Sequence, residues 1–287
     1  MEAKYFLLLF LGILLETTKN VLCTKFSKNS LNSDTDIYKF NVFSYIGSFF
    51  ISIFFGRGAF SVFTLVTAVI FALVLNLNQV FFLKALSRGT VSATNFIQSS
   101  GLVISTVGGA IICKEYIKPY NAIVLALLLF ALFLALEVKK GNLNKQWLLF
   151  AFLAMLFMGI IGIMQTYHQS SEHKDELITF LRIAFLCSSL MNIPLWKVSA
   201  RKEKETFKVK SKETALAFAS GAFIGVTHII NLFLSSVMPK IVFFPLVNGG
   251  LVFVTLLAGV IFFKERFSKT QIIGIILGII ALSVIGL

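Results

Sequence analysis

The segment Phe263-Lys264-Glu265-Arg266-Phe267-Ser268-Lys269-Thr270 ends one long apolar stretch and leads into the last one, residues 272–287. A similar arrangement occurs 150 positions earlier, where Lys114-Glu115-Tyr116 ends an apolar stretch and Ile117-Lys118-Pro119 leads into the next. The repeated order of helix, Lys-Glu, aromatic residue, hinge and helix indicates an internal duplication. On the same offset, two pairs of polar residues also correspond: Asn78 with His228, and Gln98 with Asn248.

The composition is that of a membrane protein. Of the 287 residues, 57% are hydrophobic and only 14% are charged, whereas about a quarter of the residues are charged in ordinary soluble domains. The charges form short clusters between apolar runs of roughly 18 to 25 residues, the length of a membrane-spanning helix. Because these runs are continuous rather than alternating, they indicate helices and not a barrel. The predicted fold class is therefore an all-α polytopic protein whose surroundings include the lipid bilayer.

Net charge and cysteine content exclude other classes. The net charge of +13 does not predict a nucleic-acid partner, because the basic residues flank the apolar runs, where membrane topology places them. Cys23, Cys113 and Cys187 are scattered and form no disulfide framework or metal spacing. The apolar run from Tyr5 to Leu15 is followed by no small-x-small cleavage site, so we interpret it as the first helix rather than a signal peptide.

Ten membrane helices are predicted, separated by glycine, proline and charged residues. Pro119 suits the first turn of a helix, where its missing N–H has no partner to lose. Pro194 and Pro245 lie inside apolar runs and predict kinks. The predicted spans are residues 5–24, 37–55, 60–84, 90–113, 119–138, 145–167, 177–198, 212–236, 240–263 and 270–287.

Two repeats of five helices each are expected, over residues 1–141 and 142–287. Because five is odd, the second repeat enters the membrane in the opposite orientation, so the repeats are inverted about an axis in the membrane plane. Inverted repeats are typical of secondary transporters, whose substrate site lies between them near mid-membrane. Most Lys and Arg residues lie in the loops after the odd-numbered helices. The positive-inside rule therefore places these loops in the cytoplasm and both termini outside.

This pattern resembles the EamA-type members of the drug/metabolite transporter superfamily. The residues that match best are Gly108-Gly109 with Lys114-Glu115 in the first repeat, and Gly259, Lys264-Glu265, Gly274 and Gly278 in the second. In the first helix, members often carry a Trp-Gly-Ser/Thr-Asn-like stretch, whereas this chain has Leu15-Glu16-Thr17-Thr18-Lys19-Asn20. The resemblance implies a multi-pass transporter of the plasma or bacterial inner membrane. Many members are described with termini inside, opposite to the charge distribution here.

Polar side chains at bilayer depth are candidates for a substrate site, because they are costly unless they face protein or water. In the first helix, Glu16 and Lys19 share one face and Asn20 is adjacent. They form either an internal ion pair or a cavity-lining pair in which Glu16 binds a proton or a cationic substrate. The small multidrug resistance proteins, relatives in the same superfamily, similarly place a lone Glu in their first helix.

Further candidates lie on helices that correspond between the repeats. They are amides and imidazoles that either make hydrogen bonds between helices or bind substrate. Their recurrence on corresponding helices favours the substrate site. The set comprises Asn76 and Gln79 on the third helix, Asn95 and Gln98 on the fourth, Gln165 and His168 on the sixth, His228 and Asn231 on the eighth, and Asn248 on the ninth.

Other polar groups are assigned smaller roles. The spacing of His168, Glu172 and His173 matches no zinc motif, so no metal is predicted. Arg182 is expected to pair with Glu172, Asp175 or Glu176, or to bind an anion. Lys114-Glu115 and Lys264-Glu265 are expected to cap helix ends or to hold the adjoining hinges. Gly274 and Gly278 form a GxxxG motif for packing within the chain or for a homodimer.

The predicted function is secondary transport of a small metabolite or drug by alternating access. No ATP-binding loop or other cofactor motif occurs in the sequence, so an ion or substrate gradient would provide the energy, or the protein is a facilitator. Proton or ion coupling through Glu16 is one form of this hypothesis. The alternatives are a membrane-embedded lipid-processing enzyme, for which no nucleophile or acid–base cluster is evident, and a non-transporting helical scaffold.

Overall fold

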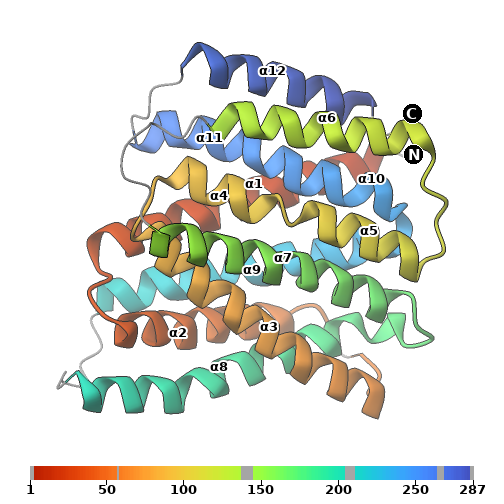
Figure 1. The fold of residues 1–287 in the computed structure, drawn as a ribbon. Coiled ribbons are helices and arrows are strands. Elements are labelled where there is room, and N and C mark those ends of the chain that lie inside the picture. Colours follow the sequence, from red (N-terminus) through yellow and green to blue (C-terminus); the bar gives the residue numbers. More distant parts are fainter. Residues whose placement is uncertain (1–2, 57, 137–144, 204–210, 264–267, 285–287) are drawn as a thin grey trace.

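The computed structural model describes residues 3–56, 58–136, 145–203, 211–263 and 268–284, and every regular element within these ranges is helical. The predicted all-helical fold class is therefore confirmed (Figure 1). The elements are α1 (Ala3–Asn29), α2 (Asp34–Ile53), α3 (Val62–Leu86), α4 (Val91–Ser99), α5 (Leu102–Ile112), α6 (Pro119–Leu136), α7 (Lys145–Gln169), η1 (Lys174–Glu176), α8 (Leu177–Lys202), α9 (Ser211–Val237), α10 (Lys240–Phe244), η2 (Pro245–Gly249), α11 (Gly250–Phe263) and α12 (Lys269–Val284).

Seven helical segments of the described chain are both long and apolar enough to cross a membrane. They are α1, α3, α4 with α5, α7, η1 with α8, α9, and the run from α10 to α11. The helix α2, which begins with Asp34 and Asp36, is not among them, and the apolar parts of α6 and α12 are shorter than a full span. The protein is therefore a multi-pass membrane protein, with fewer spans on this criterion than the ten predicted.

Two of the predicted helices contain irregular backbone. The predicted helix over 90–113 is divided at Ser100 and Gly101, between α4 and α5. A Cβ at Gly101 would lie 2.5 Å from the carbonyl oxygen of Met155, so only glycine permits this close approach to α7. At Pro245, where the sequence predicts a kink, the backbone forms the π-helix η2. Pro119 begins α6, as the sequence predicts, while Pro194 lies inside the continuous helix α8.

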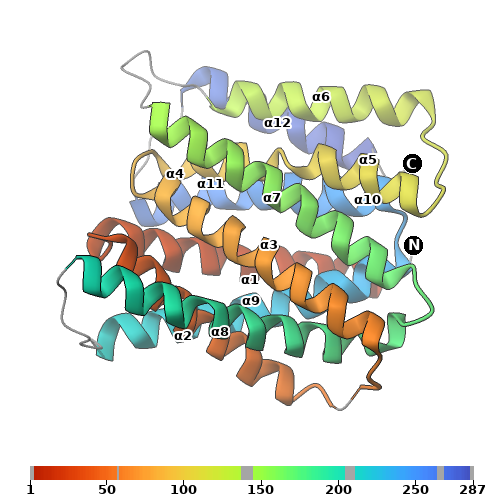
Figure 2. The ribbon, with the colours of Figure 1, turned by 60° about the horizontal axis from the view of Figure 1, so that its bottom comes forward.

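The helices pack around several apolar cores, and two of these lie on either side of the bundle. The larger core joins α2, α3, α7, α8 and α9 around Phe71, Phe180 and Phe185, and the second joins α4, α6, α11 and α12 around Leu128 and Phe253. Figure 2 shows α6 and α12 at the opposite side of the bundle from α2 and α8. Between these cores, α1 packs against α9 and α11, while α5 packs against α7.

The GxxxG motif of α12 is used for packing within the chain. Gly274 and Gly278 are both buried. A Cβ at Gly278 would overlap the ring of Phe253 on α11, so this glycine allows α12 to lie against that ring. This arrangement favours the packing role of the motif over the dimer role.

Glu115 caps a helix of the other half of the chain. Both of its carboxylate oxygens accept a hydrogen bond from the backbone N–H of Lys240, at 2.8 Å each, and one also accepts from Ile241 at 3.2 Å. These N–H groups begin α10, where they have no helical partner and where a negative charge is favourable. The expected helix-end role is confirmed for Glu115, while Lys264-Glu265 lies outside the described residues.

Replacing Glu115 by alanine is expected to destabilise the protein by about 0.5–2 kcal/mol, since this is the usual range for a lost cap. The measurement is the thermal unfolding of the detergent-solubilised variant. Glu172→Ala is the matched control, because Glu172 is also a glutamate next to a helix but is exposed. Equal melting temperatures for the two variants would contradict the capping role.

Candidate functional site

A small polar cavity lies among helices from both halves of the chain. Its volume is about 50 Å³, which is room for a few water molecules. Leu, Ile, Val and Met side chains form the apolar part of the wall. The polar part comprises Glu16 and Lys19 of α1, Tyr45 of α2, Asn78 and Gln79 of α3, Gln98 of α4, Thr227, His228 and Asn231 of α9, and Asn248 of η2.

The structure brings seven of the twelve predicted site residues to this cavity and places the other five elsewhere. The seven are Glu16, Lys19, Gln79, Gln98, His228, Asn231 and Asn248. The five that do not line it are Asn20, Asn76, Asn95, Gln165 and His168. Three polar wall residues were not among the predicted site residues: Tyr45, Asn78 and Thr227. For Asn78 a signal existed, because it corresponds to His228 on the repeat offset.

Glu16 and Lys19 form the ion pair that their spacing predicts. The Lys19 Nζ atom lies 2.6 Å from Glu16 Oε1, and the two side chains are 7% and 18% exposed, respectively. The ammonium group also lies 5.2 Å from the centroid of the Phe82 ring, within the range of a cation–π interaction. Each charge therefore compensates the other in a region where an unpaired ion would be costly.

Amide side chains of α3 and α4 form the adjoining part of the wall. Gln98 Nε2 donates to Asn78 Oδ1 at 3.2 Å, and Asn78 Nδ2 donates to the carbonyl oxygen of Ala154 at 2.8 Å. Gln79 Nε2 lies 3.5 Å from the Cys23 sulfur. These hydrogen bonds connect α3 to α1, α4 and α7, and so hold the amides at the cavity.

The second half of the chain contributes an imidazole and a further amide. Gln165 Nε2 lies 2.9 Å from His228 Nδ1. Because an amide nitrogen can only donate, Nδ1 accepts and the hydrogen of a neutral His228 ring is on Nε2. Asn248 Nδ2 donates to the carbonyl oxygen of Phe244 at 3.1 Å. Gln165 thus lies behind the cavity wall and orients one of its residues.

The remaining candidate amides make hydrogen bonds between helices. Asn20 Nδ2 donates to Asn95 Oδ1 at 2.8 Å, which joins α1 to α4. Asn76 Nδ2 donates to the carbonyl oxygen of Ser188 at 3.3 Å, and Asn76 Oδ1 accepts from Asn192, which joins α3 to α8. These contacts correspond to the alternative stated in the sequence analysis, in which the amides make hydrogen bonds between helices instead of binding substrate.

His168 belongs to a separate polar cluster where α7 ends. Its ring stacks on Phe180 with centroids 4.2 Å apart, and its Nε2 lies 3.1 Å from Thr64 Oγ1. Nearby, the carboxylate of Glu176 accepts from Ser61 Oγ at 2.7 Å and lies 3.1 Å from His173 Nδ1. This cluster joins α3, α7 and η1 and lies outside the cavity.

The expected acidic partner of Arg182 is not found in the described part of the chain. Its guanidinium donates instead to the carbonyl oxygens of Ser52, at 2.9 Å, and Gly56. The last carbonyl groups of a helix have no N–H donor within that helix. Arg182 supplies hydrogen-bond donors to carbonyl groups at the end of α2 and just beyond it. Glu172 and Asp175 are exposed. The prediction of an ion pair for Arg182 is therefore wrong.

Fold and cavity together define a multi-pass helical membrane protein with a buried polar cavity. Residues 145–287 match the EamA-like transporter family, and this match confirms the EamA-type membership that the Lys-Glu and glycine pattern indicates. The family is one of membrane transporters of small molecules.

Comparison with other proteins shows a common fold with solved structures but identifies no substrate. No curated protein matches the chain. Among solved structures, 28 chains match. One of them, a crystal structure of a protein, is 12% identical with a TM-score of 0.62, over 96% of this chain and 98% of that chain. At this identity the likeness shows a common fold alone.

Proposed function

We propose that the chain is a secondary transporter that moves a small polar molecule through the cavity by alternating access. The observation that supports this proposal is that both halves of the chain contribute residues to the cavity wall. Glu16, Asn78 and Gln98 come from the first half of the chain, and His228 and Asn248 come from the second. A site shared between two halves can open to either side when the halves rock against each other.

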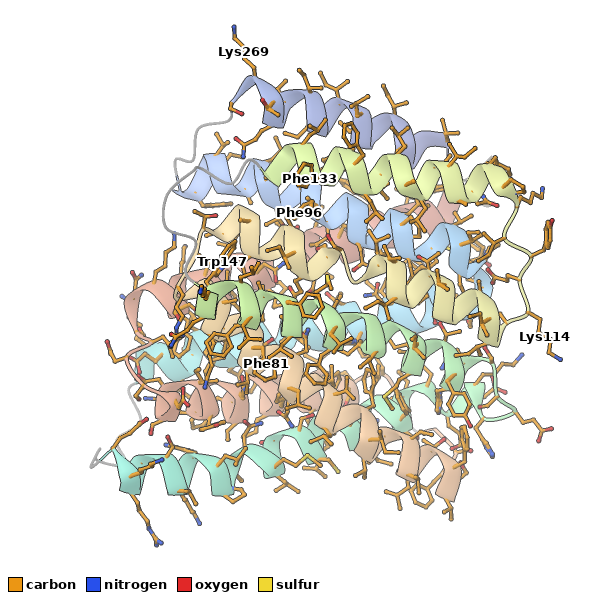
Figure 3. All side chains as sticks on the ribbon, viewed as in Figure 1. Phe81, Phe96, Lys114, Phe133, Trp147 and Lys269 are labelled. Atoms are coloured by element: carbon orange, nitrogen blue, oxygen red, sulfur yellow. The ribbon has the colours of Figure 1, made fainter. Side chains whose placement is uncertain are left out.

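Helix packing supports an inverted repeat of residues 1–141 and 142–287, with α4–α5 and α10–α11 each counted as one broken helix. Contacts occur in corresponding pairs: α1 with α9 matches α3 with α7, and α2 with α9 matches α3 with α8. Figure 3 places Lys114, just before α6, and Lys269, the first residue of α12, at opposite ends of the bundle. The corresponding helices α6 and α12 thus begin at opposite ends, as inversion requires, and this supports our proposal of ten spans.

The size of the cavity bears on the transport cycle. At about 50 Å³ it is well below the roughly 300–1,000 Å³ of typical ligand pockets. In the described conformation the cavity is therefore too small for a typical substrate, and substrate entry requires the wall to widen. The sequence contains no ATP-binding loop, so we assign the driving force to a gradient of substrate or ion across the cell membrane. Proton coupling through Glu16 is one form of this proposal. The charge distribution favours a topology with both termini outside the cell.

Truncation of cavity amides tests the proposal. A thermal-shift screen of amino acids, nucleosides and cationic drugs first identifies a substrate for uptake into liposomes. Gln98→Ala and Asn248→Ala are each expected to reduce uptake up to about tenfold, since one hydrogen bond contributes about 0.5–1.5 kcal/mol. Melting temperature and expression should stay nearly unchanged for Asn248→Ala, because the side-chain hydrogen bond of Asn248 goes to a carbonyl only four residues earlier. Gln98→Ala also loses the hydrogen bond to Asn78 of α3, so a small decrease in its melting temperature is expected.

Asn76→Ala is the matched control for this experiment, because Asn76 is also a buried amide but makes hydrogen bonds between α3 and α8. We expect it to lower the melting temperature and to leave substrate affinity of the folded protein unaltered. The reverse pattern, with destabilised Gln98 and Asn248 variants of normal affinity, would show that the cavity amides serve packing instead.

A further inference from the structure

Two basic side chains where α3 ends lie over one aromatic ring of α7. Lys84 Nζ lies 5.7 Å from the centroid of the Phe150 ring, and the guanidinium carbon of Arg88 lies 5.1 Å from it. Asp34 compensates Lys84, at 2.8 Å, whereas no carboxylate of the described residues forms a salt bridge with Arg88. Two cations beside one ring repel each other, so this place has an excess of positive charge that favours a bound anion.

The guanidinium of Arg88 is held in place and still has donors for a ligand. One terminal nitrogen donates to the carbonyl oxygen of Lys84, at 3.1 Å, and to Ser87 Oγ, at 3.2 Å. Nε and the other terminal nitrogen make no hydrogen bond within the described chain, and the side chain is exposed. These two nitrogens form one edge of the guanidinium fork, the geometry that binds a phosphate through two parallel hydrogen bonds.

The beginning of α7 brings a third cation to the same end of the bundle. A Cβ at Gly89 would overlap the indole ring of Trp147, so the first turn of α7 lies against the turn that follows α3. The indole Nε1 donates to Thr94 Oγ1 of α4 at 2.9 Å, which fixes this arrangement. Lys145 lies two residues earlier and is exposed. A third basic group thus joins the two of α3.

From these cations, three half-buried phenylalanine rings follow the line along which α3 and α7 pack side by side (Figure 2). The ring of Phe81 on α3 is stacked with those of Phe150 and Phe157 on α7, with centroids 6.1 and 5.8 Å apart. Phe150 and Phe157 are seven residues apart, which is about 10 Å along a helix. One leaflet contributes half of a hydrocarbon core of roughly 30 Å. The rings therefore form an apolar strip that covers much of the depth of one leaflet.

We propose that α3 and α7 bind one anionic phospholipid, with its phosphate at Arg88 and Lys84 and an acyl chain along the rings of Phe81, Phe150 and Phe157. Charge complementarity selects the headgroup, because a zwitterionic lipid would bring its own ammonium close to these cations. The site lies at the end of the bundle whose loops the positive-inside rule places in the cytoplasm, and the cytoplasmic leaflet is rich in anionic lipids. None of these residues lines the polar cavity.

The test is a titration of the detergent-solubilised full chain with dioleoyl phosphatidylglycerol or dioleoyl phosphatidylcholine, with bound lipid counted by native mass spectrometry. We expect the first lipid to bind at least about tenfold more tightly than the second, since hydrogen bonds between charged groups are the stronger ones. Arg88→Gln is expected to weaken binding of phosphatidylglycerol about tenfold and to leave phosphatidylcholine nearly unaffected. Its hydrogen bonds are local to the end of α3, so its melting temperature should stay close to that of the wild type.

Lys25→Gln is the matched control. Lys25 is an exposed cation near the end of α1, in front of another loop assigned to the cytoplasm, and its ammonium lies 5.9 Å from the centroid of the Phe262 ring. The variant removes the same charge from the same face of the protein, so a diffuse attraction between that face and anionic lipid would weaken equally in both variants. We expect Lys25→Gln to keep nearly the wild-type affinity for phosphatidylglycerol.

Two further measurements examine the ring and the source of the phosphate. Phe150→Leu keeps an apolar side chain but removes the ring beneath both cations, and we expect it to weaken binding of phosphatidylglycerol about two- to fivefold. Millimolar inorganic phosphate is added as a competitor to the wild type. We expect it to displace no lipid, because it lacks the acyl chain that follows the rings.

Several results would overturn the lipid site. Equal affinity of the wild type for the two lipids would show that the headgroup charge is not recognised. Equal losses in Arg88→Gln and Lys25→Gln would reduce the effect to diffuse attraction, and displacement of the lipid by inorganic phosphate would make the site one for a free anion. If Arg88→Gln yields no folded protein, unaltered lipid binding by Phe150→Leu overturns the proposal instead.

Discussion

Replacing Gly221 by valine is expected to abolish the folded protein. Gly221 lies where α9 crosses α2, and a Cβ there would overlap the backbone of Ser44, with its carbonyl carbon at 2.5 Å and its Cα at 2.8 Å. Backbone atoms cannot rotate away as a side chain can, so the helices themselves must separate. The same crossing provides a hydrogen bond of 2.7 Å from Ser48 Oγ to the Gly221 carbonyl oxygen, which separation would break.

The expected cost exceeds the usual 1–3 kcal/mol for an overpacked core, because it disrupts the contact between two whole helices. Yield of monodisperse protein in detergent and its melting temperature are the measurements. Gly12→Ala is the control, since its Cβ would meet two side-chain atoms, Cγ2 of Ile230 at 3.3 Å and Oδ1 of Asn231 at 3.8 Å, and these side chains can adjust. Wild-type yield and melting temperature for Gly221→Val would contradict the described α2–α9 crossing.

The helices could be predicted from the sequence because their causes are local. Apolar runs bounded by charges and glycines set nearly all of the helical segments, and Pro119 fixes the first residue of α6. The break at Ser100 and Gly101 was not predictable, since it accompanies a close approach to Met155 of α7. Such an approach exists only in three dimensions. The partners of Arg182 were missed for the same reason, as they are carbonyl groups that the end of α2 leaves free.

The candidate site could be predicted only in part. Asn76, Asn78 and Gln79 fall within four consecutive positions of α3, and at about 100° per residue Asn76 and Asn78 point to nearly opposite sides of the helix. The helix is apolar on every side, so the sequence does not show which direction faces the cavity. Asn78 reaches the wall while Asn76 binds α8. The Glu16–Lys19 pair, by contrast, was predictable, because residues three apart on one helix are neighbours whatever the helix packs against.

Glu16→Gln and Lys19→Gln are each expected to impair the protein more than the two changes together. Either single change leaves one ion without its partner in a largely buried place, and an unpaired charge in a membrane helix costs about 2.5–3.5 kcal/mol on insertion scales. The double change removes both ions and so removes this penalty. Thermal unfolding of the four proteins forms a double-mutant cycle whose coupling energy measures the pair. If neither single variant is destabilised, the pair is solvated and the buried ion pair is not as described.

Transport by the same variants separates the roles of the pair. If Glu16 carries a coupling proton, Glu16→Gln should abolish uptake driven by a pH gradient and still exchange substrate between the two sides. If the pair binds substrate, the double variant should recover stability but not transport, because no wall charge remains to contact the substrate. Recovered stability together with recovered driven transport would make the pair structural and would remove Glu16 and Lys19 from the site. The comparison is decisive because only the double variant lacks the penalty of an unpaired charge, so its remaining defect reports function alone.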